Sequence, residues 1–151
     1  MRQAPTKHIA LIGVPSSAGA RQLGQELAPD CLRRAGLIER LRLAGYEVTD
    51  HGDVDKSAYR PDPDHPAQQN LPQLLQVLTQ VAAVAEVATR SGARLLVLGG
   101  DCTVTIGVLA GLVKCWPELG MLYVDGDVDL NTPETTPSGI FDGMVIAHIL
   151  G

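Results

Sequence analysis

Short apolar segments alternate with helix-like patterns along the chain, and this alternation limits the possible folds more than any other feature. Residues 8–14 (HIALIGV) form a continuous apolar run, which indicates a buried strand. Further strands are expected at residues 46–51, 95–98 and 121–124, and helices at residues 29–45, 71–92, 103–116 and 143–150. Strands that alternate with helices are typical of a parallel sheet, and apolar strands need cover on both faces. The sequence therefore predicts an α/β fold with three layers (α/β/α) around a mainly parallel sheet.

Length and charge limit the number of domains and the kinds of partner. The 151 residues suffice for one domain, which we expect to span residues 1–151 with a proline-rich loop at residues 53–70. Twelve Lys and Arg against 17 Asp and Glu give a net charge of −5, so neither a nucleic acid nor a membrane is expected as a partner. Three scattered cysteines, with no signal peptide or membrane span in the sequence, predict a cytoplasmic protein.

Three aspartates stand at alternate positions after the last predicted strand. If the chain stays extended, the carboxylates of Asp125, Asp127 and Asp129 point the same way and repel one another unless a cation or a proton neutralises them. Such oxygen ligands suit Mn²⁺, Mg²⁺ or Ca²⁺; the alternative is a solvated acidic turn. An EF-hand is excluded, because Leu130 and Thr136 stand where that loop requires glycine and glutamate.

A second group of chemically distinctive residues follows the third predicted strand. Gly99 and Gly100 allow a sharp turn, after which come Asp101 and Cys102. Because parallel strands end at one edge of a sheet, this turn is expected at the same edge as the three aspartates. The thiol of Cys102 can serve as a metal ligand, a nucleophile or a small buried group, and the sequence leaves these alternatives open.

Four blocks of sequence keep a recognisable order and spacing. They are IGVPSSAGARQLG with APDCLRRAGL, then LVLGGDCT, LGMLYVDGDVDLNTPETTPSG and FDGMVIAHILG. Together they resemble the amino-terminal half of an arginase-like ureohydrolase, in the superfamily of arginases, agmatinases and formiminoglutamases. Asn-Thr-Pro followed by Thr-Thr-x-Ser-Gly favours an arginase within that superfamily. The resemblance implies an arginase/deacetylase-like fold, truncated to its first half.

The resemblance also implies a metal centre. Such enzymes hydrolyse the guanidino group of arginine or a related compound with a water activated by two Mn²⁺ ions. By position, Asp125 would be the bridging carboxylate and Asp129 a ligand of one ion. Cys102 and Asp127 stand where the family has metal-binding histidines, so its metal motifs are degenerate here. A thiolate ligand favours zinc or iron over manganese.

The resemblance further assigns residues to the substrate. Asn131 and Ser138 would hydrogen-bond the α-carboxylate of an amino-acid substrate, with Thr136 nearby in the same substrate site. Asp142 stands at the position of the family's proton-shuttling histidine, and a carboxyl group does that work near neutral pH only when burial raises its pKa. Ile140 replaces an asparagine that contacts substrate. The second Asp-x-Asp pair of the family and the acid that holds the guanidinium lie in the half that this sequence lacks.

Three hypotheses about function follow. The chain is a diverged ureohydrolase half, impaired or inactive alone; or a non-catalytic pseudoenzyme that acts as a binding or assembly module; or a mononuclear metal protein that uses Cys102 and the three aspartates. In the family, later strands insert between the early ones, so an open sheet edge is expected here. We therefore expect a homo-oligomer or a complementary carboxyl-terminal half as partner, and a guanidino or amino-acid compound as ligand.

Overall fold

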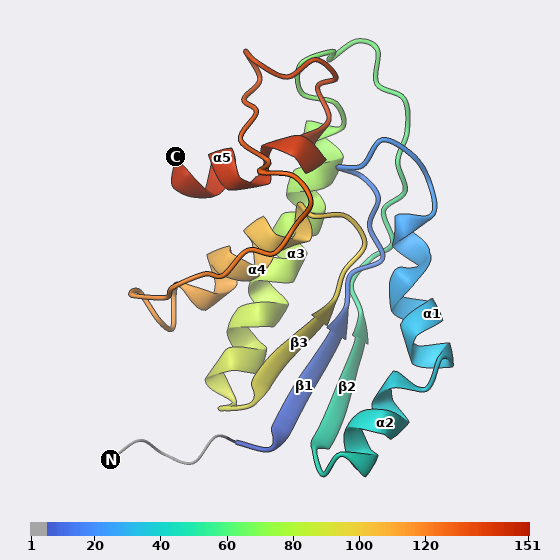
Figure 1. Cartoon of the computed structure of the whole chain (residues 1–151), viewed down its shortest axis with the longest axis vertical. Coiled ribbons are helices and arrows are strands. Elements are labelled where there is room, and N and C mark those ends of the chain that lie inside the picture. Colours follow the sequence, from blue (N-terminus) through green and yellow to red (C-terminus); the bar gives the residue numbers. More distant parts are fainter. Residues whose placement is uncertain (1–5) are drawn as a thin grey trace.

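Three parallel strands form the sheet at the centre of the molecule (Figure 1). The computed structural model describes residues 6–151. Strands β1 (His8–Gly13), β2 (Glu47–Asp53) and β3 (Arg94–Leu98) lie in the order β2-β1-β3, and β1 pairs in parallel with both neighbours. The apolar run at the start of the chain is thus the central strand, and β3 is an edge strand.

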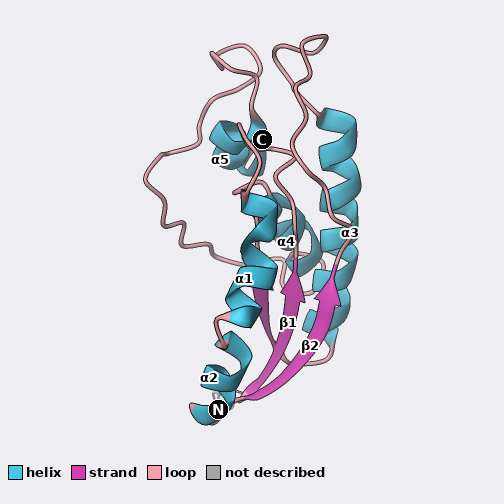
Figure 2. Cartoon of the chain, turned by 90° about the vertical axis from the view of Figure 1, so that its right-hand side faces the viewer, coloured by secondary structure: helices cyan, strands magenta, loops and turns pink. Residues whose placement is uncertain are grey.

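Helices cover both faces of this sheet (Figures 1 and 2). Ile9 and Leu11 of β1 point to one face, where they pack with residues of helix α2 (Leu37–Leu43), which follows helix α1 (Ala28–Arg34). Ala10 and Ile12 point to the other face, towards α3 (Leu71–Arg90). Alternate side chains of a strand face opposite ways, so β1 is buried on both sides. The predicted three-layer α/β/α arrangement with a parallel sheet is confirmed.

The first predicted helix is divided into two. A single helix was expected between Pro29 and Gly45, but α1 ends at Arg34 and α2 begins at Leu37. Gly36 between them has φ of 80°, a left-handed conformation that glycine adopts without steric cost and that ends a helix. The prediction of one continuous helix was wrong because its apolar spacing continues through the break.

Helix α3 packs against α4 (Val104–Leu112) on the second face of the sheet. Its buried residues recur at helical spacing: Leu74, Val77, Val81, Ala85 and Ala88. By length and composition alone α3 could cross a membrane, but this buried stripe, packed on α4 and the sheet, is what a core helix of a globular protein has. Glycines of α4 contact α3 directly, and a Cβ at position 111 would lie 2.4 Å from the carbonyl oxygen of Ala82.

The fourth predicted strand does not form in the described part of the chain. Residues 121–124 are loop, and Leu122 and Val124 are 91% and 86% exposed. A strand needs a neighbour that satisfies its backbone N–H and C=O groups, and the sheet ends at β3. The strand prediction for these residues was wrong for this chain, because a strand pattern is realised only where a partner strand exists.

The end of the chain closes over the carboxyl end of the sheet. A 3₁₀ turn (Phe141–Met144) leads into α5 (Val145–Leu150), close to the predicted helix at residues 143–150. Phe141 and Met144 pack on Leu74 at the start of α3. The proline-rich loop before α3 supports the same region, because the Gln69 amide donates to the carbonyl of Gly139 at 2.9 Å. These contacts hold residues 131–143 in place although they contain little regular structure.

Asp101 fixes the glycine-rich loop after β1 to the turn after β3. It is 4% exposed, and its carboxylate accepts hydrogen bonds from the Gly19 amide at 3.1 Å and the Thr103 amide at 3.0 Å. Burial raises the pKa of this carboxyl group. Gly100 permits the close approach, because a Cβ there would lie 1.7 Å from the carbonyl oxygen of Ser16. Two segments that belong to different strands thus become one rigid edge.

An Asp101→Ala variant is expected to lose about 2–6 kcal/mol of unfolding free energy, because two buried amide N–H groups lose their acceptor. Urea unfolding followed by circular dichroism measures the loss. Asp30→Ala is the matched control: Asp30 pairs with Arg34 on the exposed surface of α1, so a change below about 1 kcal/mol is expected. Equal losses in the two variants would show that Asp101 does not join the two segments.

Candidate metal and substrate site

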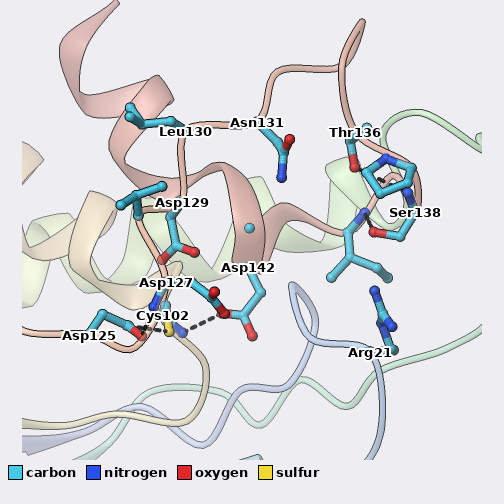
Figure 3. Close-up of a pocket in the computed structure, with 14 residues that line it drawn as sticks. Arg21, Cys102, Asp125, Asp127, Asp129, Leu130, Asn131, Thr136, Ser138 and Asp142 are labelled. Carbon is cyan, nitrogen blue, oxygen red and sulfur yellow. Dashed lines mark hydrogen bonds between the residues drawn. The ribbon is translucent and has the colours of Figure 1, made fainter.

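A cavity of about 540 Å³ lies at the carboxyl end of the sheet, between the turn after β3 and residues 125–143 (Figure 3). Its lining includes all eight side chains that the sequence assigned to metal, substrate or proton transfer: Cys102, Asp125, Asp127, Asp129, Asn131, Thr136, Ser138 and Asp142. Cys102 lies in the turn after β3, at the carboxyl end of the parallel sheet. Residues up to 40 positions further along the chain are brought to it by tertiary contacts, such as the hydrogen bond from the Cys102 amide to Asp142.

Three of these residues form a compact group of possible metal ligands. One ligand atom each from Cys102, Asp125 and Asp129 lies within 4.8 Å of the other two. Asp127 lines the same cavity but stands outside this group. The expectation that three alternate carboxylates point the same way required an extended chain, and residues 125–130 are not a strand. The structure thus gathers two of the three aspartates with the thiol.

Asp129 owes its place to an unusual backbone conformation. The φ of Asp129 is 47°, in the left-handed region that non-glycine residues rarely adopt. The residue is also buried, with 7% of its surface exposed. Two amides in the first turn of α5, those of Ile146 and Ala147, donate to the Asp129 carbonyl at 3.0 and 3.2 Å. The Tyr123 hydroxyl donates to its carboxylate at 2.6 Å. Burial, and the nearby charge of Asp125, raise the pKa of Asp129. Strain of this kind is tolerated where a side chain must be held in one position.

Asp125 differs from Asp129 in its environment. It is exposed, and its carboxylate accepts hydrogen bonds from the amides of Asp127 and Gly126 and from the Cys102 thiol. These donors lower the pKa of Asp125, the Asp127 amide contributing most. Asp125 is therefore an anion at neutral pH that already faces the thiol.

Cys102 is held between two carboxylates. Its amide donates to Asp142 at 2.8 Å, and its Sγ lies 3.4 Å from a carboxylate oxygen of Asp125. Burial raises the pKa of the Cys102 thiol, and the negative charges of Asp142 and Asp125 raise it further. Without a cation the group therefore stays protonated, which argues against a nucleophilic role. A bound divalent ion would lower the pKa of the thiol again, since a thiol that coordinates a metal loses its proton.

The loop at residues 131–139 presents hydroxyl groups to the cavity. The Thr136 hydroxyl oxygen accepts from the amides of Ser138 and Gly139 at 3.3 and 3.0 Å. The Ser138 hydroxyl oxygen accepts from the Ile140 amide at 3.3 Å. A hydroxyl that uses its lone pairs in this way still has its O–H to donate. Both hydroxyl groups therefore keep an O–H that is free to donate a hydrogen bond.

Arg21 lines the same cavity and was missed by the sequence analysis. It belongs to the glycine-rich loop after β1, and Figure 3 places it on the side away from Asp125, near Ser138. One signal could have found it: a basic residue in the first loop after a parallel strand, hence at the edge where the aspartates gather.

Fold and site together define an α/β protein with a polar cleft at the carboxyl end of a parallel sheet. A sequence model of the Arginase family matches residues 7–151, and this chain belongs to that family. It is 37% identical to an arginase of Bacillus caldovelox over 147 residues, which is 96% of this chain and 49% of that protein.

Solved structures agree with this assignment. The arginase of Bacillus cereus superposes with a TM-score of 0.86 at 38% identity, over 97% of this chain and 48% of that one. The arginase of Entamoeba histolytica, solved in complex with L-ornithine, gives a TM-score of 0.77 at 26% identity, over 97% and 50%. The resemblance seen in the four sequence blocks is thus confirmed. The chain spans about half the length of the relatives it matches.

Proposed function

We propose that this chain is the amino-terminal half of a metal-dependent hydrolase that cleaves the guanidino C–N bond of arginine or a related compound. The observation that carries the proposal is the single cavity lined by all eight assigned side chains, in a chain of the Arginase family. The part of the site that relatives carry in their other half is missing, so we propose that this chain alone is impaired or inactive.

The donor set fits one divalent ion. Cys102, Asp125 and Asp129 offer three ligands, and a fourth position left for water or substrate is typical of catalytic zinc sites. Manganese is the ion that the family resemblance implies, but a thiolate favours zinc or iron. A pair of ions needs more carboxylates than this group offers among the described residues. The proposal is therefore one ion here, with any second ion dependent on ligands from the other half.

The side chains divide the work of hydrolysis. A divalent ion at the cysteine and aspartates would lower the pKa of a water molecule and so supply a nucleophile near neutral pH. Asn131, Thr136 and Ser138 would hold the carboxylate of the amino acid and so fix the guanidino carbon opposite the acidic wall. After water adds to the guanidino carbon, the bond from this carbon to the side-chain nitrogen breaks. The departing nitrogen takes up the proton that the water gives up, and we propose Asp142, by its position in the family pattern, as the group that carries this proton.

We further propose a partner chain, an amino-acid ligand and a cytoplasmic location. The unpaired edge of β3 and the exposed Leu122 and Val124 favour association with a complementary half, or with a second copy of this chain. The complex of the Entamoeba histolytica arginase with L-ornithine supports an amino-acid ligand. The negative charge and the scattered cysteines are what we expect of a cytoplasmic protein.

Metal analysis and urea release test the proposal together. The chain is purified without chelators, alone and mixed with the carboxyl-terminal half of a related arginase. We expect about one equivalent of Zn²⁺ or Fe²⁺ in the chain alone, and metal-dependent urea release from L-arginine only in the mixture. Rapid urea release by the chain alone would overturn the proposed impairment. A mixture that assembles but neither holds metal nor releases urea would favour the pseudoenzyme.

A further inference from the structure

The cavity has opposite charges on its two sides. Four aspartates, Asp125, Asp127, Asp129 and Asp142, supply its negative side, whereas Arg21 is the one cation among the described residues that line it. Figure 3 shows Arg21 well separated from Asp125, with Asp142 between them. A ligand that carries an anionic group at one end and a cationic group at the other therefore fits in one orientation only.

The backbone that carries Arg21 is fixed relative to the cavity. The amide of Asp142 donates to the carbonyl of Gly19 at 2.9 Å, and the Gly19 amide donates to Asp101 at 3.1 Å. Ala20, the residue before Arg21, is 1% exposed. The start of the arginine side chain is thus anchored to both walls of the site, although its guanidinium lies on the surface.

The guanidinium of Arg21 is available to a ligand. Within residues 6–151, no Asp or Glu oxygen lies within ion-pair distance of Arg21, whereas Arg33, Arg34 and Arg90 are each paired with carboxylates. The planar guanidinium donates two parallel hydrogen bonds to a carboxylate, a geometry that lysine cannot reproduce. Arg21 also lies on the same side of the cavity as Ser138.

We propose that Arg21 binds the carboxylate of the amino-acid ligand and so makes the site select α-amino acids over their decarboxylated analogues. This inference rests on the proposed function, whose substrate it specifies. Arg21 pairs with the carboxylate, Ser138 donates a hydrogen bond to it, and the guanidino end extends to the acidic side. Agmatine, which is arginine without its carboxylate, offers Arg21 no anion to pair with, so Arg21 adds nothing to the affinity for agmatine.

Calorimetric titration of the metal-loaded chain with L-arginine and with agmatine tests this. We expect Arg21→Ala to weaken L-arginine binding about 10- to 100-fold and to leave agmatine binding unchanged, since a charge-assisted pair is lost only with arginine. Arg21→Lys should recover part of the loss, because the charge returns without the planar fork. The control is Arg34→Ala, which removes the same charge from α1 outside the cavity and should change neither affinity.

The outcomes separate this inference from the function on which it rests. If the unaltered chain binds L-arginine and Arg21→Ala binds it equally well, Arg21 is not the carboxylate ligand, and the proposed function stands. If Arg21→Ala weakens both ligands alike, the residue acts on overall charge or folding, and the inference is overturned. If the unaltered chain binds neither ligand, the inference about Arg21 is overturned, whereas the proposed function is decided by urea release from the mixture of the two halves.

Discussion

Replacing Cys102 with alanine is expected to reduce the affinity of this chain for Zn²⁺ or Co²⁺ by at least about 100-fold, since loss of a direct ligand exceeds the usual effect of an outer-shell change. The thiol lies within 4.8 Å of the Asp125 and Asp129 ligand atoms, so its removal leaves two carboxylates for the ion. Asp129→Asn should reduce the affinity by a comparable factor, because the buried carboxylate of Asp129 supplies a negatively charged ligand atom in the same group.

Co²⁺ provides the measurement, because a cobalt–thiolate bond absorbs strongly in the near ultraviolet. The unaltered chain should show this band and saturate at about one equivalent. Cys115→Ala and Cys31→Ala are the controls: both cysteines are free thiols that do not line the cavity, and the band should persist in both variants. Persistence of the band in Cys102→Ala would show that a different thiol binds Co²⁺, and an unchanged Co²⁺ affinity in that variant would remove Cys102 from the site.

The second large effect is expected at the open edge of the sheet. Mixing this chain with the carboxyl-terminal half of a related arginase should give a one-to-one complex of higher stability. The reason is that β3 has no outer neighbour among residues 6–151 and that Leu122 and Val124 are exposed. Burying these two side chains alone is worth about 3–6 kcal/mol. Sedimentation shows the complex, and hydrogen exchange should slow at residues 94–98 and 121–124.

A pair of substitutions makes this test specific. The double variant Leu122→Lys and Val124→Lys places charges on the apolar segment and should abolish the complex while leaving the isolated chain folded, because both side chains are already exposed. Leu43→Lys is the control, since Leu43 is 88% exposed on α2, away from this edge. Self-association of the chain that the double variant disperses would identify a second copy as the occupant. A complex that survives the double variant would contradict docking at this segment.

Much of the site was predictable from its place after apolar, strand-like segments, although residues 121–124, which precede the aspartates, form a loop and not a strand. The Gly99-Gly100 turn and the aspartates after residue 124 were expected at one edge of the sheet, and the cavity gathers both. The order of sequence blocks indicated the Arginase family, which is confirmed. The position of Asp127 outside the compact ligand group was not predictable, because the backbone at residues 125–130 is not an extended strand. Nor was the left-handed conformation of Asp129, whose carbonyl accepts from amides of α5, a helix that follows later in the chain.

By itself, the sequence determined the α/β class, the parallel sheet and the family. Each of these follows from local periodicity and from motifs short enough to be recognised without their neighbours. Tertiary structure decided that residues 121–124 stay outside the sheet, and that Arg21 faces the aspartates across one cavity. Both outcomes depend on segments that are distant along the chain, and a local pattern carries no information about whether a distant partner is present or what it places nearby.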